Sequence, residues 1–205
     1  MPAVIDNLTF NVAQLLKEPI GATRNGQVVA GLFGLLPELE QTAPAAHREQ
    51  DTPVSPKLDA TMREQAGEPV LTGPVRLMHT QGGVLVQGRL YALATLSCSR
   101  CLELVSVPLD VELEEIFTPT IDILTGRPVK SEEEDRALWI DDRHLLDLGE
   151  VLRQDVLVAL PMHVVCREEC RGLCPVCGQN LNQGSCGCTP EPDARWAALL
   201  DLLKE

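Results

Sequence analysis

Eight cysteines are the residues of this sequence whose type and spacing point most directly to chemistry. They fall into four close pairs: Cys98-x2-Cys101, Cys166-x3-Cys170, Cys174-x2-Cys177 and Cys186-x-Cys188. Zinc takes four soft ligands in a tetrahedron, and two thiolates from one tight turn are the usual half of such a site. The run CPVCG at 174–178 has the form of a zinc knuckle, because Gly178 can take the positive φ that follows such a turn.

Eight thiolates are enough for two zinc sites, and the spacing leaves their pairing open. One site could close locally with Cys174, Cys177, Cys186 and Cys188. The second would then use Cys98, Cys101, Cys166 and Cys170, across 64 intervening residues. The rival arrangement is one ion held by Cys98, Cys101, Cys174 and Cys177, with the other four cysteines accessory. In either case the ligands are all cysteines, so one or two structural Zn²⁺ ions in closed sites are expected, not a catalytic metal.

The competing chemistry for the same residues is disulfide or redox chemistry. A redox pair at Cys98 and Cys101 would favour a helix N-terminus directly after the first cysteine, which lowers the thiol pKa. The residues after Cys101 have the spacing of a strand instead. The N-terminal residues have neither a basic opening nor an apolar signal core, so we expect a cytoplasmic protein, in which disulfides rarely persist. Metal binding is therefore the favoured hypothesis.

The elements around the cysteines predict an α+β fold: an antiparallel sheet packed by one or two helices, followed by a zinc-stabilised cysteine-rich C-terminal segment. Residues 70–117 have strand spacing with a hairpin turn at Gly82-Gly83. A helix is predicted over 147–160, opened by Asp147 and Glu150 as a capping box and ended by Pro161. A terminal helix is predicted after Asp193, with one apolar face made of Trp196, Leu199, Leu200 and Leu203.

Four segments follow from this organisation. Residues 1–18 are predicted to be a strand and helical turn that join the main domain. Residues 19–69 contain six prolines and long polar runs, and are predicted to be an insertion or linker. Residues 70–165 form the α+β core, and residues 166–205 form the zinc segment with the terminal helix.

The charge is acidic and unevenly distributed, which bears on partners. The formal net charge is −13, and residues 103–155 contribute 15 acidic against 5 basic side chains. Such a field does not attract nucleic acid. The acidic run Glu132, Glu133, Glu134 and Asp135 is a candidate surface for a protein partner. The basic residues near the cysteines are the candidates for direct RNA contact, with ion pairing to nearby acids as their plainer role: Arg167, Arg171 and Arg195.

Several classes of function are disfavoured. Aromatic residues make up only 3% of the chain, so a base-stacking platform is hard to build. No apolar run approaches the roughly 20 residues that a membrane helix needs. No set of nucleophile, base and acid can be assembled from the sequence, so we expect no catalytic residues, no small-molecule substrate and no enzyme. His163 lies three residues before Cys166, where a surface position is favoured over a spare metal ligand.

Three stretches resemble the YceD family, the large ribosomal RNA subunit accumulation proteins. They are the cysteine block CREECRGLCPVCGQNLNQGSCGC, the earlier LSCSRCLELV and the closing PDARWAALLDLL. The resemblance covers about 70–205 well and 1–20 in outline, while the Pro-rich stretch 20–69 departs from it.

The resemblance implies a cytoplasmic, non-enzymatic ribosome biogenesis factor for large-subunit ribosomal RNA processing or accumulation. Its partners would be a ribosomal assembly intermediate or a basic ribosomal protein, with ribosomal RNA contacted directly or through that protein. Two other functions stay open at this point: a redox-sensing thiol protein, and a zinc-stabilised protein-interaction module unrelated to ribosomes.

Overall fold

The chain divides into two compact units, each built from two stretches of sequence. The computed structural model describes residues 7–37, 69–129 and 135–189. The sheet unit comprises Met1–Leu96 and Ser106–Met162, and the cysteine unit comprises Ser97–Val105 and His163–Glu205. The predicted limits placed residues 97–105 in the α+β core. The structure groups them with the cysteine-rich segment instead, because Cys98 and Cys101 lie against Cys170 and Cys166.

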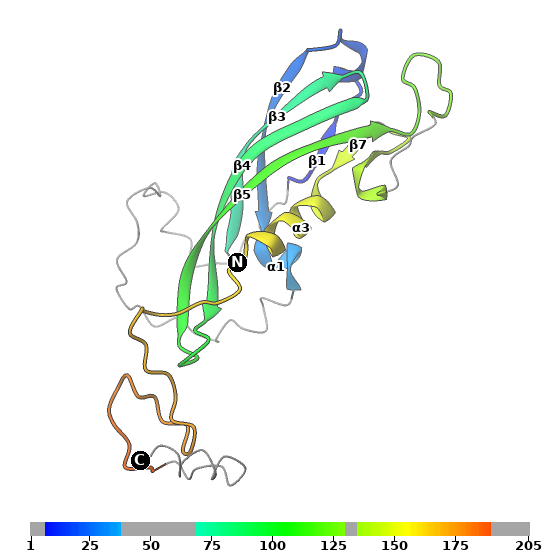
Figure 1. Ribbon diagram of the computed structural model, residues 1–205. Coiled ribbons are helices and arrows are strands. Elements are labelled where there is room, and N and C mark those ends of the chain that lie inside the picture. Colours follow the sequence, from blue (N-terminus) through cyan, green and yellow to red (C-terminus); the bar gives the residue numbers. More distant parts are fainter. Residues whose placement is uncertain (1–6, 38–68, 130–134, 190–205) are drawn as a thin grey trace, which may run out of the picture. The chain divides into compact units, whose positions relative to one another are not determined.

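The sheet of the sheet unit has the strand order β2-β3-β4-β5-β6 (Figure 1). Its strands are β2 (Thr23–Gly31), β3 (Val70–Thr80), β4 (Gly83–Ser97), β5 (Leu104–Pro119) and β6 (Trp139–Ile140). β3 pairs antiparallel with β2 and with β4, and β6 pairs parallel with the end of β5 at Thr118 and Pro119. The predicted hairpin turn is confirmed, since Thr80 pairs with Gly83 across it.

Smaller elements complete the sheet unit. β1 (Thr9–Asn11) pairs antiparallel with β7 (Leu145–Asp147). Two 3₁₀ turns cover 15–17 and 136–138, and two helices are described, α1 (Leu32–Leu35) and α3 (Gly149–Ala159). The strand and helical turn predicted within 1–18 are therefore present as β1 and the turn at 15–17. The terminal helix predicted after Asp193 lies outside the described residues.

The helix predicted over 147–160 is confirmed, but its predicted capping box is wrong. α3 begins at Gly149, and its N-cap residue, Leu148, makes no side-chain cap hydrogen bond. The carboxylate of Asp147 accepts a hydrogen bond from the Gly149 N–H, at 2.9 Å. The Glu150 side chain pairs with Arg153 one turn later instead of reaching back to the cap. The two acids thus stand one residue too early for reciprocal capping.

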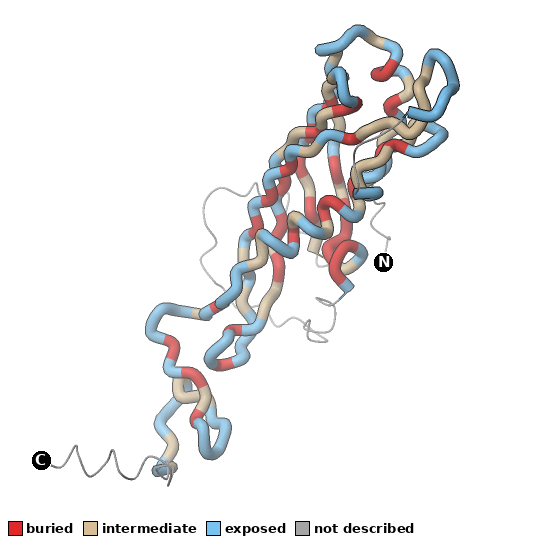
Figure 2. The backbone as a smooth tube through the Cα atoms, turned by 45° about the vertical axis from the view of Figure 1, so that its right-hand side comes forward, coloured by how far each residue is buried: buried red, intermediate tan, exposed pale blue. Residues whose placement is uncertain are grey.

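Leu and Val side chains build the core of the sheet unit, as the scarcity of aromatic residues predicts. Buried and exposed residues alternate along the long strands (Figure 2), so that one face of each strand faces the core. α3 closes the core with Val151, Leu152 and Val156. The largest fully buried side chains include Phe117, Leu15, Leu32, Leu71, Leu90, Leu113 and Leu152.

The prediction that residues 19–69 form an insertion or linker is wrong for their first part. Residues 23–31 form β2, which pairs with β3 from Thr23 opposite Met78 to Gly31 opposite Val70. Only the second half of β2 is apolar, with Val28 and Ala30 fully buried, and this short signal is easily lost beside a Pro-rich stretch. Residues 38–68 lie outside the described residues.

None of the described helices combines the length and the apolar character that crossing a membrane requires.

Candidate metal centres

The first cysteine pair lies on the short connection between β4 and β5. The N–H of Arg100 donates to Cys98 Sγ at 3.4 Å, and the N–H of Leu102 donates to the Cys98 carbonyl at 3.0 Å. The N–H of Cys98 in turn donates to the Glu103 carbonyl at 2.8 Å. To follow this path the backbone takes φ of 61° at Leu102, a left-handed conformation that costs a non-glycine residue roughly 1–2 kcal/mol.

The turn at Cys174–Gly178 repeats the same three hydrogen bonds. The N–H of Val176 donates to Cys174 Sγ at 3.4 Å, the N–H of Gly178 to the Cys174 carbonyl at 2.9 Å, and the N–H of Cys174 to the Gln179 carbonyl at 2.8 Å. Gly178 has φ of 74°. The two CxxC turns are therefore the same structure, although one uses Leu and the other Gly at the left-handed position.

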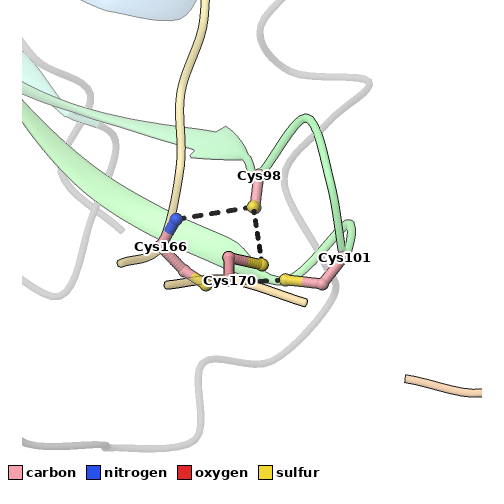
Figure 3. Close-up of side chains that lie close together, drawn as sticks. All are labelled: Cys98, Cys101, Cys166 and Cys170. Carbon is pink, nitrogen blue, oxygen red and sulfur yellow. Dashed lines mark hydrogen bonds between the residues drawn. The ribbon is translucent and has the colours of Figure 1, made fainter. Parts of the chain in front are cut away.

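Four cysteines form the first group: Cys98, Cys101, Cys166 and Cys170 (Figure 3). Their sulfur atoms all lie within 4.8 Å of one another, with Cys98 and Cys170 at 3.9 Å and Cys101 and Cys166 at 3.6 Å. Four sulfurs bound at about 2.3 Å around one tetrahedral zinc stand roughly 3.8 Å apart. A disulfide would need about 2.05 Å. The separations therefore fit one shared metal ion and do not fit disulfides.

The second group consists of Cys174, Cys177, Cys186 and Cys188, with sulfur atoms again within 4.8 Å of one another. Of the two arrangements considered from the sequence, the structure has the one with two separate groups. All eight cysteines are free thiols. The groups differ in burial: Cys98, Cys101 and Cys170 are buried, whereas in the second group only Cys174 is buried and Cys177 is exposed.

Each cysteine group contains a thiol whose pKa is well below the usual value. Burial raises the pKa of Cys98, but hydrogen bonds from the backbone of Cys101, Arg100 and Cys166 outweigh it and lower that pKa to about 6. Backbone hydrogen bonds at Cys177 and Val176 lower the pKa of Cys174 to about 6.

Each group also contains a thiol that resists ionisation. Burial raises the pKa of Cys101 to about 12, and the hydrogen bond with Cys177, followed by burial, raises that of Cys188 to about 12. Each group thus combines at least one thiol whose pKa is lowered with at least one whose pKa is raised, so the four thiols of a group need a cation before they can all be ionised together.

Polar side chains around the first group hold the cysteine unit together, and the sequence did not indicate them. The Asn182 amide donates to Cys170 Sγ at 3.4 Å, and this is the main cause of the lowered pKa of Cys170. The Glu103 carboxylate accepts from Asn180 at 2.8 Å. The Arg100 guanidinium donates to the carbonyls of Cys170 and Glu168, at 3.1 Å and 3.4 Å. These bonds fix the path of residues 168–182, which supply ligands to both groups.

The structure describes only some of the basic and acidic residues that were predicted to contact partners. Arg167 and Arg171 are exposed and make no ion pair within the described part of the chain, so the expected pairing with Glu168 and Glu169 is not seen there. Arg195 lies outside the described residues, as do Glu132, Glu133 and Glu134. Asp135 caps the 3₁₀ turn at 136–138 by accepting from the Ala137 N–H. His163 is exposed and belongs to neither cysteine group.

Comparison with known proteins gives a family match. The family model "Large ribosomal RNA subunit accumulation protein YceD" matches residues 86–203, which include all eight cysteines. No solved structure matches the chain.

Relatives with curated sequences come from Mycobacterium species and from plants. An uncharacterised protein of Mycobacterium bovis is 33% identical over 129 residues, covering 63% of this chain and 60% of that protein. A chloroplastic YCED homolog 1 of Zea mays is 29% identical over 163 residues, with 65% and 53% covered, and its Arabidopsis thaliana counterpart is 26% identical over 148 residues, with 58% and 44% covered. The match thus spans at most about 60% of the length of these relatives.

Proposed function

The chain belongs to the YceD family, and from this premise we propose that it is a non-enzymatic factor supporting the processing or accumulation of large-subunit ribosomal RNA in the cytoplasm. The observation that carries the proposal is the family match over residues 86–203. The two plant relatives are named large ribosomal RNA subunit accumulation proteins, and the role is carried from those names to this chain. The matched region contains both cysteine groups and α3, so it covers parts of both units of the structure.

The charge of the protein favours work through a protein partner. Asp110, Glu112 and Glu114 stand exposed at alternate positions of β5, in the part of the chain with the largest acidic excess. A four-cysteine zinc site adds a net −2, so two of them take the chain from −13 to about −17. A basic ribosomal protein or an assembly intermediate that exposes one is the partner that this field would attract. Direct RNA contact is confined in this proposal to Arg167, Arg171 and Arg195.

Depletion in a native host tests the role. We expect loss of the chain to lower mature large-subunit ribosomal RNA relative to small-subunit ribosomal RNA, and the tagged chain to co-sediment with large-subunit precursors. An unchanged ratio of the two RNAs, with the chain absent from every ribosomal fraction, would contradict the proposal.

Binding to naked RNA tests the adaptor mechanism separately. We expect weak binding of the pure protein to naked large-subunit ribosomal RNA across a salt series. The double variant Arg167→Gln, Arg171→Gln should remove what binding there is, with Arg76→Gln on β3 as the control. Submicromolar binding near physiological salt, with a slope that implies many phosphate contacts, would overturn the adaptor mechanism.

We propose further that each cysteine group holds one structural Zn²⁺. Native mass spectrometry should find two zinc ions per chain, and Cys174→Ser should release one of them, while Ser99→Ala, a change to a residue that is not a ligand, should release none. A single ion that survives the loss of both Cys186 and Cys188 would support the shared-site arrangement. Disulfides in anaerobically purified protein would overturn both arrangements.

A further inference from the structure

A groove on the sheet unit lies outside everything assigned so far. It runs between the middle of β5 and the C-terminal half of α3, and its volume is about 230 Å³. We call it the edge groove; its lining residues are Asp110, Val111, Glu112, Asp155, Val158 and Ala159. Val158 is 86% exposed, and Leu157 beside it is also exposed, so α3 presents apolar surface to solvent here.

One wall of the edge groove is the open edge of a strand. β5 pairs with β4 on one side, and on the other side it pairs with β6 only at Thr118 and Pro119. Within the described residues, Ser106–Phe117 therefore has no strand partner along that second edge. Figure 1 shows β5 as the last long strand of the sheet. A strand edge of this length has backbone N–H and C=O groups available to a further strand.

The side chains at the groove are those that a basic partner would need. Asp110 and Glu112 line the groove. The one ion pair that these two acids make among the described residues joins Asp110 to Arg89 at 3.4 Å, and both of its side chains are more than half exposed. Asp155 faces them from α3, and its Oδ2 atom is buried without a hydrogen-bond partner among the described residues. A buried acceptor left unpaired is costly, and a donor from a ligand would satisfy it.

We propose that the edge groove binds an extended, basic segment of a partner protein, which adds to the free edge of β5 as a further strand. Main-chain hydrogen bonds along β5 supply the affinity common to strand addition. Lysine or arginine side chains of the segment meet Asp110, Glu112 and Asp155, and its apolar side chains cover Val158. The identity of the partner, a basic ribosomal protein, rests on the proposed function. The binding of a basic strand to the groove does not depend on it.

Two other occupants fit these residues less well. RNA carries the same sign of charge as the groove. A second copy of this chain, paired edge to edge through β5, would bring two rows of carboxylates together, and like charges placed opposite each other are destabilising.

A synthetic peptide of about ten residues that alternates Lys and Val tests the proposal, since that is the length of an ordinary strand. We expect it to bind the full-length zinc-loaded protein in fluorescence anisotropy, and to slow hydrogen exchange at 110–114. A peptide with Pro in place of every second Val keeps the charge but loses main-chain donors, and should bind at least about tenfold more weakly. Equal binding of the two peptides would overturn strand addition.

A pair of matched variants locates the site on the protein. Val158→Arg should weaken binding of the Lys-Val peptide by about tenfold or more, because it places a cation in the groove and removes the apolar contact. Leu124→Arg is the control: it makes the same change at a position of the same unit that is 81% exposed and does not line the groove. Equal binding by the two variants, or a stable dimer of the protein that Val158→Arg disrupts, would overturn the proposal.

The same variants separate this proposal from the proposed function. If Val158→Arg abolishes peptide binding but leaves co-sedimentation with ribosomal precursors unchanged, the assignment of the ribosomal partner to this groove is wrong while the function stands. If the peptide binds as expected but the protein never associates with ribosomal particles, the proposed function is wrong while the groove stands as a strand-binding site.

Discussion

The sheet unit and the cysteine unit bury different kinds of atoms. In the sheet unit, aliphatic side chains from the strands and from α3 pack with Phe117 into one continuous core. In the cysteine unit, the buried cluster consists of Cys98, Cys101 and Cys170, with Val105, Cys166 and Leu173 packed against it. Three buried thiols give little apolar area compared with a dozen leucines. The comparison teaches that one unit can be stable through burial alone, whereas the other would depend on metal ions held by its two cysteine groups.

Metal removal should have the largest effect and should separate the two units. A strong zinc chelator is expected to unfold the cysteine unit, because binding energy at structural zinc sites, about 10–16 kcal/mol in zinc-finger peptides, serves as folding energy. The sheet unit should keep its fold. Hydrogen exchange checks this: amides of 163–189 should lose protection while those of β3 and β4 retain it. Full protection of 163–189 in the metal-free protein would break the comparison.

A core truncation should show the opposite pattern. Phe117 is fully buried, so Phe117→Ala should lower the free energy of unfolding of the sheet unit by about 3–5 kcal/mol. The zinc content measured by native mass spectrometry should not change. Ile116→Ala, at the neighbouring residue that is 48% exposed, is the control and should change the free energy by no more than about 0.5 kcal/mol. If Phe117→Ala is too unstable to isolate, Phe117→Leu should show a smaller loss. Loss of zinc from either folded variant would contradict the independence of the two units.

The two CxxC turns offer a smaller and more local test within the cysteine unit. Leu102→Gly should relieve about 1 kcal/mol of left-handed strain and slow the release of metal to a competing chelator. Gly178→Ala should have the reverse effect of similar size. A Cβ at Gly178 would meet no atom within 4 Å, so only the backbone conformation changes in that variant. Faster metal release from Leu102→Gly would contradict this expectation. It would mean that the exposed Leu102 side chain stabilises the metal-bound turn by more than its left-handed backbone destabilises it.

Acid should act on the two units in opposite directions, with the smallest effect in the sheet unit. Burial, and then the charge of Glu115, raises the pKa of Asp155. The ionised carboxylate therefore destabilises the folded state above that pKa, and the penalty disappears as pH falls through it. Asp155→Asn should stabilise the sheet unit slightly at neutral pH in urea unfolding, with a gain that fades on acidification. In the cysteine unit, acid should release metal, because protons compete for the thiolates.

The sequence predicted the parts of the molecule whose residues repeat with a regular period. Alternation identified the strands within 70–117, and spacing identified α3 and both CxxC turns. β2 was missed because its first residues, TRNGQ, carry no apolar alternation, and its burial depends on pairing with β3. Asn182 and Glu103 were missed because a single amide or carboxylate near a sulfur atom leaves no pattern in the sequence. The edge groove was missed because it depends on where the strand order ends.

The position of Cys98 and Cys101 in the chain has a consequence for the unfolded protein. A metal ion that joins Cys101 to Cys166 closes a loop of 64 intervening residues, and that loop contains β5 from Leu104, β6, β7 and α3. If the metal is treated as a cross-link, closing such a loop removes chain entropy worth about 4 kcal/mol at 25 °C from the unfolded ensemble. The second group closes only the short stretch from Cys174 to Cys188 and restrains none of the strands. An ion bound by the first group would thus limit the conformations available to two of the five strands of the main sheet, β5 and β6, before either has formed.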